Sequence, residues 1–265
     1  MRGHVVDGAL RSLRRTATAV GHVARTAWRT LGWLWWEDEC EPAAYALTPR
    51  NRRQLAAWLA TLADTRIEQV QALVEELEDD KALRDHLRAG PRDEVGVARA
   101  DPEYGRWAAA YVLTRLRRPR VVVESGVGAG LGACVVASAL ERNTAEGHPG
   151  FYYGLDPRLG AGRLLRGRFE RYGWILAGSP IESLKELDSV DLYLYSRPRS
   201  ETQEGREYET LAGRLAEDAM LLGATAHQSD ALFDFAVQSG RRYLYFAEEP
   251  ADHWYRGSGL GAAFT

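Results

Sequence analysis

Apolar residues recur at three- and four-residue steps through the first 36 residues of the chain. This spacing gathers them on one stripe of a helix, while the other faces hold six arginines and a single acid, Asp7. The stripe consists of Val6, Leu10, Leu13, Ala17, Val20, Ala24, Ala27, Leu31 and Leu34. The pattern predicts a basic amphipathic helix over residues 1–36 that ends in a tryptophan-rich turn.

Two kinds of partner suit the apolar stripe of this helix. The first is protein, either the chain's own domain or a second copy. Packing on a second copy predicts a homo-oligomer joined through the N-terminal helices. The second is an anionic membrane, where arginines meet headgroups and Trp33, Trp35 and Trp36 suit the boundary with the acyl chains. No apolar run approaches the roughly 20 residues of a membrane span, and no signal-peptide pattern is present, so a cytoplasmic location is expected.

Helical patterns also cover residues 48–88 and 104–117. Thr48-Pro49 has the sequence of an N-cap followed by a proline in the first turn, and Ala89-Gly90-Pro91 ends the block. No segment before residue 119 has the pattern of a strand. We therefore expect residues 1–118 to form a helical extension to the domain that follows.

The pattern changes at residue 119, where short β-branched and aromatic runs begin to alternate with helical segments. The expected strands are residues 120–123, 151–155, 174–177, 190–195, 220–225 and 243–247. The expected helices are residues 134–140, 158–172, 181–187 and 203–215. This alternation predicts an α/β domain over residues 119–265 with a doubly wound, mostly parallel sheet.

Composition and charge narrow the possible partners only slightly. The chain has 265 residues and a net charge of -3, which gives no reason to expect a nucleic-acid partner. Cys40 and Cys134 lie far apart and form neither a disulfide framework nor a zinc knuckle. This cysteine usage fits a reducing compartment.

A glycine-rich segment, Glu124-Ser-Gly126-Val-Gly128-Ala-Gly130, joins the first expected strand to the helix after it. Glycines let the backbone turn tightly and approach a ligand, and the helix behind them presents unpaired N–H groups and the positive end of its dipole. Asp156 closes the next strand, where an acid can bond a ribose. The segment therefore predicts a cofactor site.

Two cofactors compete for this site. Gly128, Gly130 and Ala133 fit the dinucleotide fingerprint G-x-G-x-x-A, with Asp156 on the ribose of NAD. Glu124 argues against this interpretation, because a carboxylate near a pyrophosphate is repelled. S-adenosylmethionine (SAM) has no phosphate and carries an amine and a sulfonium, which an acid attracts. The charge therefore favours SAM.

The segment Val121–Leu140 resembles motif I of class I SAM-dependent methyltransferases, and the wider pattern is similar to the bacterial macrocin-type O-methyltransferase group. The resemblance covers about residues 104–265 and includes Arg118-Pro119-Arg120-Val121, Gly154-Leu155-Asp156 and Asp191-Leu192-Tyr193. It implies a Rossmann-like fold of seven strands that ends in an antiparallel pair. The cofactor-binding residues that it implies are Glu124, Gly126, Gly128 and Gly130 for the methionine part of SAM, Asp156 for the ribose and Ser179 near the adenine.

The chain departs from this group after the fourth strand. Relatives have an acid- and histidine-rich stretch there, whereas this chain has Arg197 and Arg199. A Mg²⁺ or Ca²⁺ site needs oxygen ligands that guanidinium groups do not supply, so no metal site is expected. Transfer to a hydroxyl would then use a base, for which His227 is the first candidate and His253 the second. The two arginines suit an acidic or phosphorylated acceptor, and the alternative interpretation is a solvated turn.

The function expected from the sequence is metal-independent O- or N-methyl transfer from SAM to a small-molecule acceptor. The missing acids also suit a second hypothesis, in which a SAM-fold domain without catalytic activity acts as a scaffold or regulatory partner. A NAD-binding oxidoreductase is the least favoured hypothesis.

Overall fold

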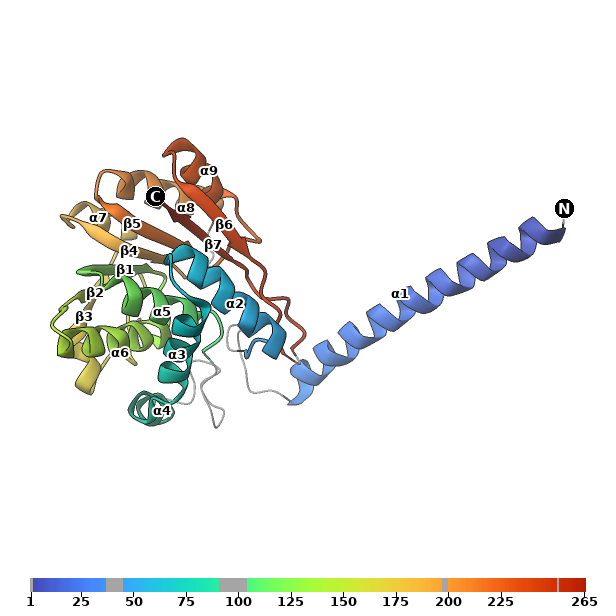
Figure 1. Cartoon of the computed structure of the whole chain (residues 1–265), viewed down its shortest axis with the longest axis horizontal. Helices are drawn as coiled ribbons and strands as arrows, with labels where there is room; N and C mark the ends of the chain where they lie inside the picture. The colour runs from blue at the N-terminus through green and yellow to red at the C-terminus, as the bar shows by residue number, and fades with distance from the viewer. Residues whose placement is uncertain (1, 37–44, 91–103, 197–199, 252) are drawn as a thin grey trace.

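The computed structural model describes residues 2–36, 45–90, 104–196, 200–251 and 253–265. Its centre is a seven-stranded sheet with the order β3-β2-β1-β4-β5-β7-β6 (Figure 1). The strands are β1 (Val121–Ser125), β2 (Phe151–Asp156), β3 (Gly173–Ala177), β4 (Val190–Tyr195), β5 (Leu215–Gly223), β6 (Arg242–Phe246) and β7 (Leu260–Phe264). This sheet confirms the Rossmann-like, mostly parallel architecture expected from the sequence.

The strand pairing defines where a ligand can bind. Strands β3, β2, β1, β4 and β5 pair in parallel, and β7 lies antiparallel between β5 and β6. The strand order reverses between β1 and β4, because β1 has β2 on its other side. Ligands of open α/β sheets bind at the carboxyl ends of the strands beside such a reversal.

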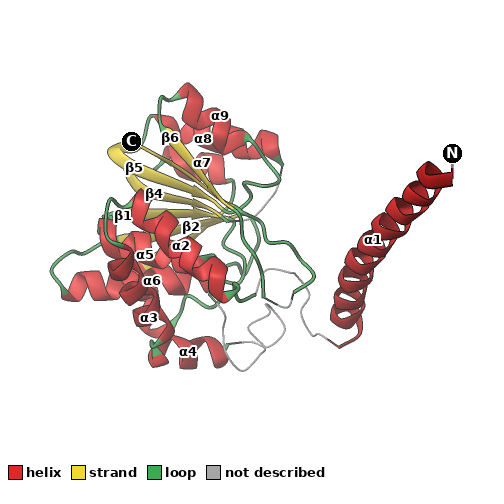
Figure 2. Cartoon of the chain, turned by 45° about the vertical axis from the view of Figure 1, so that its right-hand side comes forward, coloured by secondary structure: helices red, strands yellow, loops and turns green. Residues whose placement is uncertain are grey.

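Helices cover both faces of the sheet (Figure 2). One layer contains α2 (Pro49–Leu62), α3 (Ile67–Glu78), α4 (Lys81–Arg88), α5 (Trp107–Arg117) and α6 (Leu131–Ala145), and the other contains α7 (Pro180–Lys185), α8 (Glu201–Ala212) and α9 (Ala231–Gln238). Successive strand residues serve opposite faces. Leu192 and Leu194 therefore join the core under the first layer, and Tyr193 joins the core under the second.

Helix α6 packs against α4, α5 and β2, and residues 131–140 are all buried. Its many small residues, such as Ala133 and Ala137, let α5 and the sheet approach it closely. Helix α2 begins as expected, because the Thr48 hydroxyl accepts a hydrogen bond from Asn51 N at 3.2 Å. The buried residues of α2 to α6 form one continuous core with this face of the sheet.

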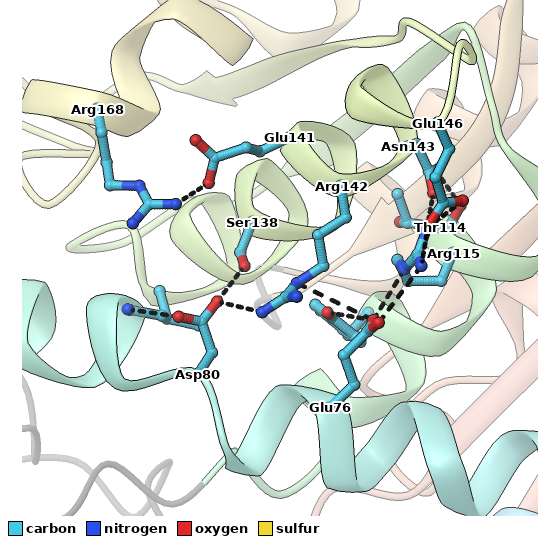
Figure 3. Close-up of polar contacts among 12 residues, drawn as sticks. Glu76, Asp80, Thr114, Arg115, Ser138, Glu141, Arg142, Asn143, Glu146 and Arg168 are labelled. Atoms are coloured by element: carbon cyan, nitrogen blue, oxygen red, sulfur yellow. Dashed lines mark hydrogen bonds and ion pairs between the residues drawn. The ribbon is translucent and has the colours of Figure 1, made fainter.

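A polar network joins α3, α4, α5 and α6 (Figure 3). Arg115 Nε donates to Glu76 Oε1 at 2.8 Å, and the Arg115 side chain is only 9% exposed. Asp80 Oδ2 accepts from Ser138 Oγ at 2.7 Å and from Arg142 Nη2 at 3.1 Å. Partly buried pairs are screened less than surface pairs, so this network stabilises the packing of the N-terminal helices on α6.

Three local expectations differ from the structure. The helix expected over residues 158–172 is wrong: turns and bends occupy residues 158–165, and a 3-10 helix, η2 (Gly167–Tyr172), ends the segment. Gly160 and Gly162 have φ of +80° and +71°, values that a right-handed helix cannot contain. Leu215 begins β5 instead of ending a helix, and α9 was not expected.

Helix α1 (Arg2–Trp36) is one continuous helix, as the spacing of its apolar residues predicts. In both views it lies apart from the rest of the molecule (Figures 1 and 2). Within the described part of the chain, no helix combines the length and the apolar character needed to cross a membrane.

Candidate functional site

The glycine-rich turn connects the carboxyl end of β1 to the first turn of α6. Gly126, Gly128 and Gly130 have φ of +87°, +62° and +103°, in the region that L side chains rarely adopt. Gly126 N donates to Leu155 O of the neighbouring strand at 2.9 Å. The turn therefore holds the N-terminus of α6 beside the ends of β1 and β2, which is the arrangement of a cofactor cradle.

Glu124 is buried at the end of β1. Tyr152 Oη donates to Glu124 Oε2 at 2.6 Å. A Cβ added at Gly132 would lie 2.9 Å from the same oxygen and 2.5 Å from Cζ3 of Trp107. The acid, the first turn of α6 and the indole ring therefore meet at one place, and only glycine fits position 132. An acid there suits a cationic ligand group rather than a phosphate.

Asp156 is buried at the end of β2, on the other side of the turn. Its carboxylate accepts hydrogen bonds from Gly128 N at 3.1 Å and from Arg158 Nε and Nη2, each at 3.0 Å. Burial acts to raise the pKa of Asp156, but the hydrogen bonds from Arg158 and Gly128 outweigh it and lower the pKa. The carboxylate is therefore ionised at neutral pH. The Arg158 side chain is 52% exposed, so it can turn into solvent when the hydrogen bonds of a ligand replace its own at the carboxylate.

The loop after β2 is attached to the glycine-rich turn. Gly162 N donates to Gly128 O at 2.8 Å, and Leu164 N donates to Ala129 O at 2.9 Å. Cys134 Sγ of α6 donates to Leu164 O at 3.1 Å. Burial raises the pKa of this thiol. The attachment fixes the turn from its outer side and holds residues 158–166 next to the carboxylate at the end of β2.

The start of α5 connects the glycine-rich turn to the segments that follow β4 and precede β7. The Arg106 guanidinium lies over the Trp107 ring, 5.5 Å from its centroid. It donates to Ser258 Oγ at 3.2 Å and, through a longer contact of 3.5 Å, to Ser196 O. Ser196 directly follows β4, and Ser258 precedes β7. One side chain therefore links three segments around the predicted site.

His227 follows β5 at the same edge and is exposed. Its Nδ1 lies within hydrogen-bond distance of Ser258 O. A carbonyl only accepts, so Nδ1 carries the hydrogen and the neutral ring has its lone pair on Nε2. Gln228 Nε2 lies 3.3 Å from His227 Nε2, and because this amide is on an exposed side chain it can move aside for an acceptor, unlike a backbone N–H. The structure thus holds His227 in the tautomer that a base requires.

His253 lies in an aromatic cluster close to His227. Its Nδ1 accepts from Tyr255 N at 3.0 Å, so the neutral ring carries its hydrogen on Nε2. The ring stacks on Trp254 at a centroid distance of 6.0 Å. The rings of both histidines lie 6.4 Å from the Tyr255 ring, so the structure brings the two candidates together. Of the two, His227 has the better geometry for a base.

Two further positions from the sequence lie at opposite edges of the sheet. Ser179 is exposed and is the N-cap residue of α7, two residues beyond Ala177, which pairs with Asp156 in the register of β2 and β3. That position is compatible with the adenine role that the resemblance implies. Asp191 lies at the amino edge, where it accepts from Val121 N at 2.7 Å and fixes the start of β1 against β4.

Two expectations from the sequence remain, the absence of a metal site and the contact of two arginines with the acceptor. Within the described residues, no three His, Cys, Asp or Glu side chains are grouped so that they could hold a metal ion. Arg197 and Arg199 lie outside the described residues, so their contact with an acidic acceptor stays a prediction.

Sequence reasoning missed Arg106 and Arg158 as members of the site. Arg158 had a local signal, because an arginine two residues after an acid can fold back onto it. Arg106 had none, since its partner Ser258 is 152 residues away in the chain.

No protein-family model matches this sequence, and no curated protein matches it. The fold does match solved structures. An O-methyltransferase from Streptomyces achromogenes, involved in tomaymycin synthesis and solved in complex with SAM, is 14% identical with a TM-score of 0.50, over 71% of this chain and 90% of its own. An S-adenosylhomocysteine-bound methyltransferase from Podospora anserina is 14% identical with a TM-score of 0.50, over 74% and 95%. These matches confirm the fold that motif I implies.

Proposed function

We propose that the chain is a SAM-dependent methyltransferase that acts on a small-molecule acceptor. The observation that carries the proposal is the placement of two buried acids, Glu124 and Asp156, at the ends of adjacent parallel strands beside a turn of three glycines. Bound there, SAM would supply a methyl group on a sulfonium that needs no further activation. Glu124 would hold the amine of the methionine part, and Asp156 would accept hydrogen bonds from the ribose hydroxyls.

The charges around the turn support SAM over a dinucleotide. A pyrophosphate at the N-terminus of α6 would lie near Glu124 and Asp156, both of which are acids. The cation closest to Asp156 in the described residues is Arg158, which is already paired with that carboxylate. SAM brings positive charge to the same place, so its electrostatic fit is better.

The acceptor is proposed to bind between Trp107 and His227. Arg106 connects the two positions through Ser258, and all of them lie at the carboxyl edge of the sheet. His227 Nε2 would take the proton of an acceptor hydroxyl or amine as the methyl group is transferred. Metal-independent transfer is part of the proposal, because Arg197 and Arg199 stand where related enzymes supply oxygen ligands. We place the reaction in the cytoplasm, and a macrocin-type acceptor stays a prediction.

The Arg158–Asp156 pair also supports the alternative of a scaffold without catalytic activity. In this structure the arginine covers the carboxylate oxygens that a ribose would use. A domain in which this pair is permanent would keep the fold without binding the cofactor. The two functions therefore differ in one measurable property, the affinity for SAM.

Calorimetric titration of the full chain with SAM and with S-adenosylhomocysteine tests the proposal. We expect both to bind, and we expect Glu124→Gln and Asp156→Asn to abolish most of the heat while the exposed control Glu209→Gln leaves it unchanged. Absence of heat and of a thermal shift with either compound would remove the methyltransferase proposal. Binding without turnover over a panel of hydroxyl and amine acceptors would favour the scaffold. Turnover that EDTA leaves unchanged would support the metal-independent reaction.

A further inference from the structure

Helix α1 presents an apolar face that the proposed function does not use. Successive residues of an α-helix are about 100° apart, so Val20, Val23, Leu31 and Leu34 fall within a sector of roughly 80°. All four side chains are exposed. Aligned apolar side chains on one stripe normally pack against something, so this face requires a partner surface.

The rest of the helix indicates which kind of surface. Trp28 and Trp35 are seven residues apart, lie along one edge of the apolar sector and are each 72% exposed. Arg14, Arg15 and Arg29 fall on the opposite side of the helix and are also exposed. An exposed apolar stripe with tryptophans at its edge and arginines opposite it is the pattern of a helix that lies in a membrane interface.

We propose that α1 lies flat on an anionic lipid bilayer, with its apolar face in the acyl boundary and its arginines among the headgroups. The sequence of α1 has six arginines and one acid, whereas the whole chain has a net charge of -3, so the positive charge is concentrated in this helix. Its 35 residues extend over about 50 Å. A bilayer offers apolar and anionic groups together along that whole length.

Pairing with α1 of a second copy accounts for only one face of the helix. Two such helices joined through their apolar faces would turn their arginines outward, so the pairing covers the apolar stripe but does not explain the positive charge opposite it. The acidic remainder of a second copy would satisfy the arginines but not a continuous apolar stripe. An anionic membrane satisfies both faces of the helix.

Co-sedimentation of the full chain with vesicles tests this proposal. One set of vesicles is phosphatidylcholine alone, and the other contains about 30 mol% phosphatidylglycerol. We expect binding to the anionic vesicles, little binding to the neutral ones, and release at about 0.5 M salt, where charge attraction is screened. Tryptophan fluorescence should shift to the blue on binding.

Two sets of variants separate the faces of the helix. Arg14→Glu/Arg15→Glu/Arg29→Glu removes charge attraction, and Leu31→Glu/Leu34→Glu removes the apolar face; each is expected to weaken binding to anionic vesicles at least about tenfold. The control replaces three exposed arginines outside α1, Arg50, Arg53 and Arg206, with glutamates. Its net charge changes by the same amount as in the triple arginine variant of α1. It should bind as the unaltered chain does. All variants should have the melting temperature of the unaltered chain, since the changed side chains are exposed.

Several results would overturn the proposal. Equal binding to neutral and anionic vesicles would remove the role of the arginines, and equal loss in the control would show that only total charge matters. Absence of lipid binding, together with a dimer that Leu31→Glu/Leu34→Glu dissociates, would assign the face to a second copy. None of these results depends on whether the protein binds SAM.

Discussion

Arg158 binds Asp156 through two parallel hydrogen bonds, Nε to Oδ1 and Nη2 to Oδ2, each 3.0 Å long. The backbone N of Arg158 donates to Oδ1 as well, also at 3.0 Å. Ribose hydroxyls would use the same two carboxylate oxygens. The arginine and the proposed cofactor therefore compete for one acid.

We expect Arg158→Ala to strengthen the binding of SAM. Arg158 is half exposed, whereas Asp156 is buried. With about 1 kcal/mol, the upper value for exposed ion pairs, taken as the cost of displacing the arginine, the Kd should fall roughly three- to fivefold. The backbone hydrogen bond to Asp156 remains in the variant and keeps the carboxylate in place. Calorimetric titration measures the change, and Arg163→Ala, on the same loop, serves as the control with an unchanged Kd. Weaker binding in Arg158→Ala would show that the arginine contributes to the site.

His227→Gln should lower kcat by about 10²-fold or more, because the variant has no nitrogen that can accept the acceptor's proton. The Kd for SAM should stay within about twofold, since His227 lies beyond β5 and not at the glycine-rich turn. Release of S-adenosylhomocysteine, measured with an acceptor found in the panel, gives kcat. A variant with normal kcat would exclude His227 as the base.

His253→Gln is the matched comparison. In the neutral ring Nδ1 is held by Tyr255 N, so the histidine has no accepting nitrogen for a substrate proton. We expect kcat to change by less than about threefold. A larger loss than in His227→Gln would reverse the assignment of the two histidines.

The sequence was sufficient for the parts of this molecule that local pattern determines. Val190–Tyr195 was predicted with its observed bounds, and the glycine-rich turn has the positive φ values that its glycines allow. The loop at residues 158–166 was mistaken for a helix, because its apolar spacing is helical while Gly160 and Gly162 turn the chain the other way. The site was only partly predictable: Arg106 reaches it through tertiary packing that no sequence spacing encodes.

Asp80 supports a prediction about stability. It caps the first turn of α4 by accepting from Leu83 N at 2.9 Å, and it also binds Ser138 and Arg142 of α6 (Figure 3). Asp80→Ala removes the cap and the hydrogen bonds from Ser138 and Arg142, so the free energy of unfolding should fall by about 2–4 kcal/mol. Urea denaturation measures it. The neighbouring residue Asp79 is exposed and serves as the control. Asp79→Ala should change the free energy of unfolding by less than about 0.5 kcal/mol.

The same network predicts a loss of stability in acid. Burial acts to raise the pKa of both Glu76 and Asp80, but hydrogen bonds outweigh burial and lower both pKa values. Glu76 accepts these bonds from Arg115 and Tyr111. Asp80 accepts them from Leu83 N, Ser138 and Arg142. Carboxyls with a lowered pKa stabilise the fold above their unfolded pKa of about 4 and lose that contribution as the pH falls. Between about pH 5 and pH 3, the unaltered chain should therefore lose stability more steeply than Asp80→Asn. Parallel slopes in urea denaturation would contradict this.

Two glycine-to-alanine substitutions in helices should have opposite effects. In α8, Gly205 has open space where the methyl group of an alanine would lie, so Gly205→Ala should raise the free energy of unfolding by about 0.5–1 kcal/mol through helix propensity. In α6, a methyl at Gly132 would lie 2.5 Å from the Trp107 ring and 2.9 Å from Glu124, so Gly132→Ala should lower it by about 1–3 kcal/mol. It should also weaken SAM binding, because the displaced ring and acid border the proposed methionine site. Thermal unfolding and calorimetry of both variants check the pair, and a stabilised Gly132→Ala would show that the ring does not pack there.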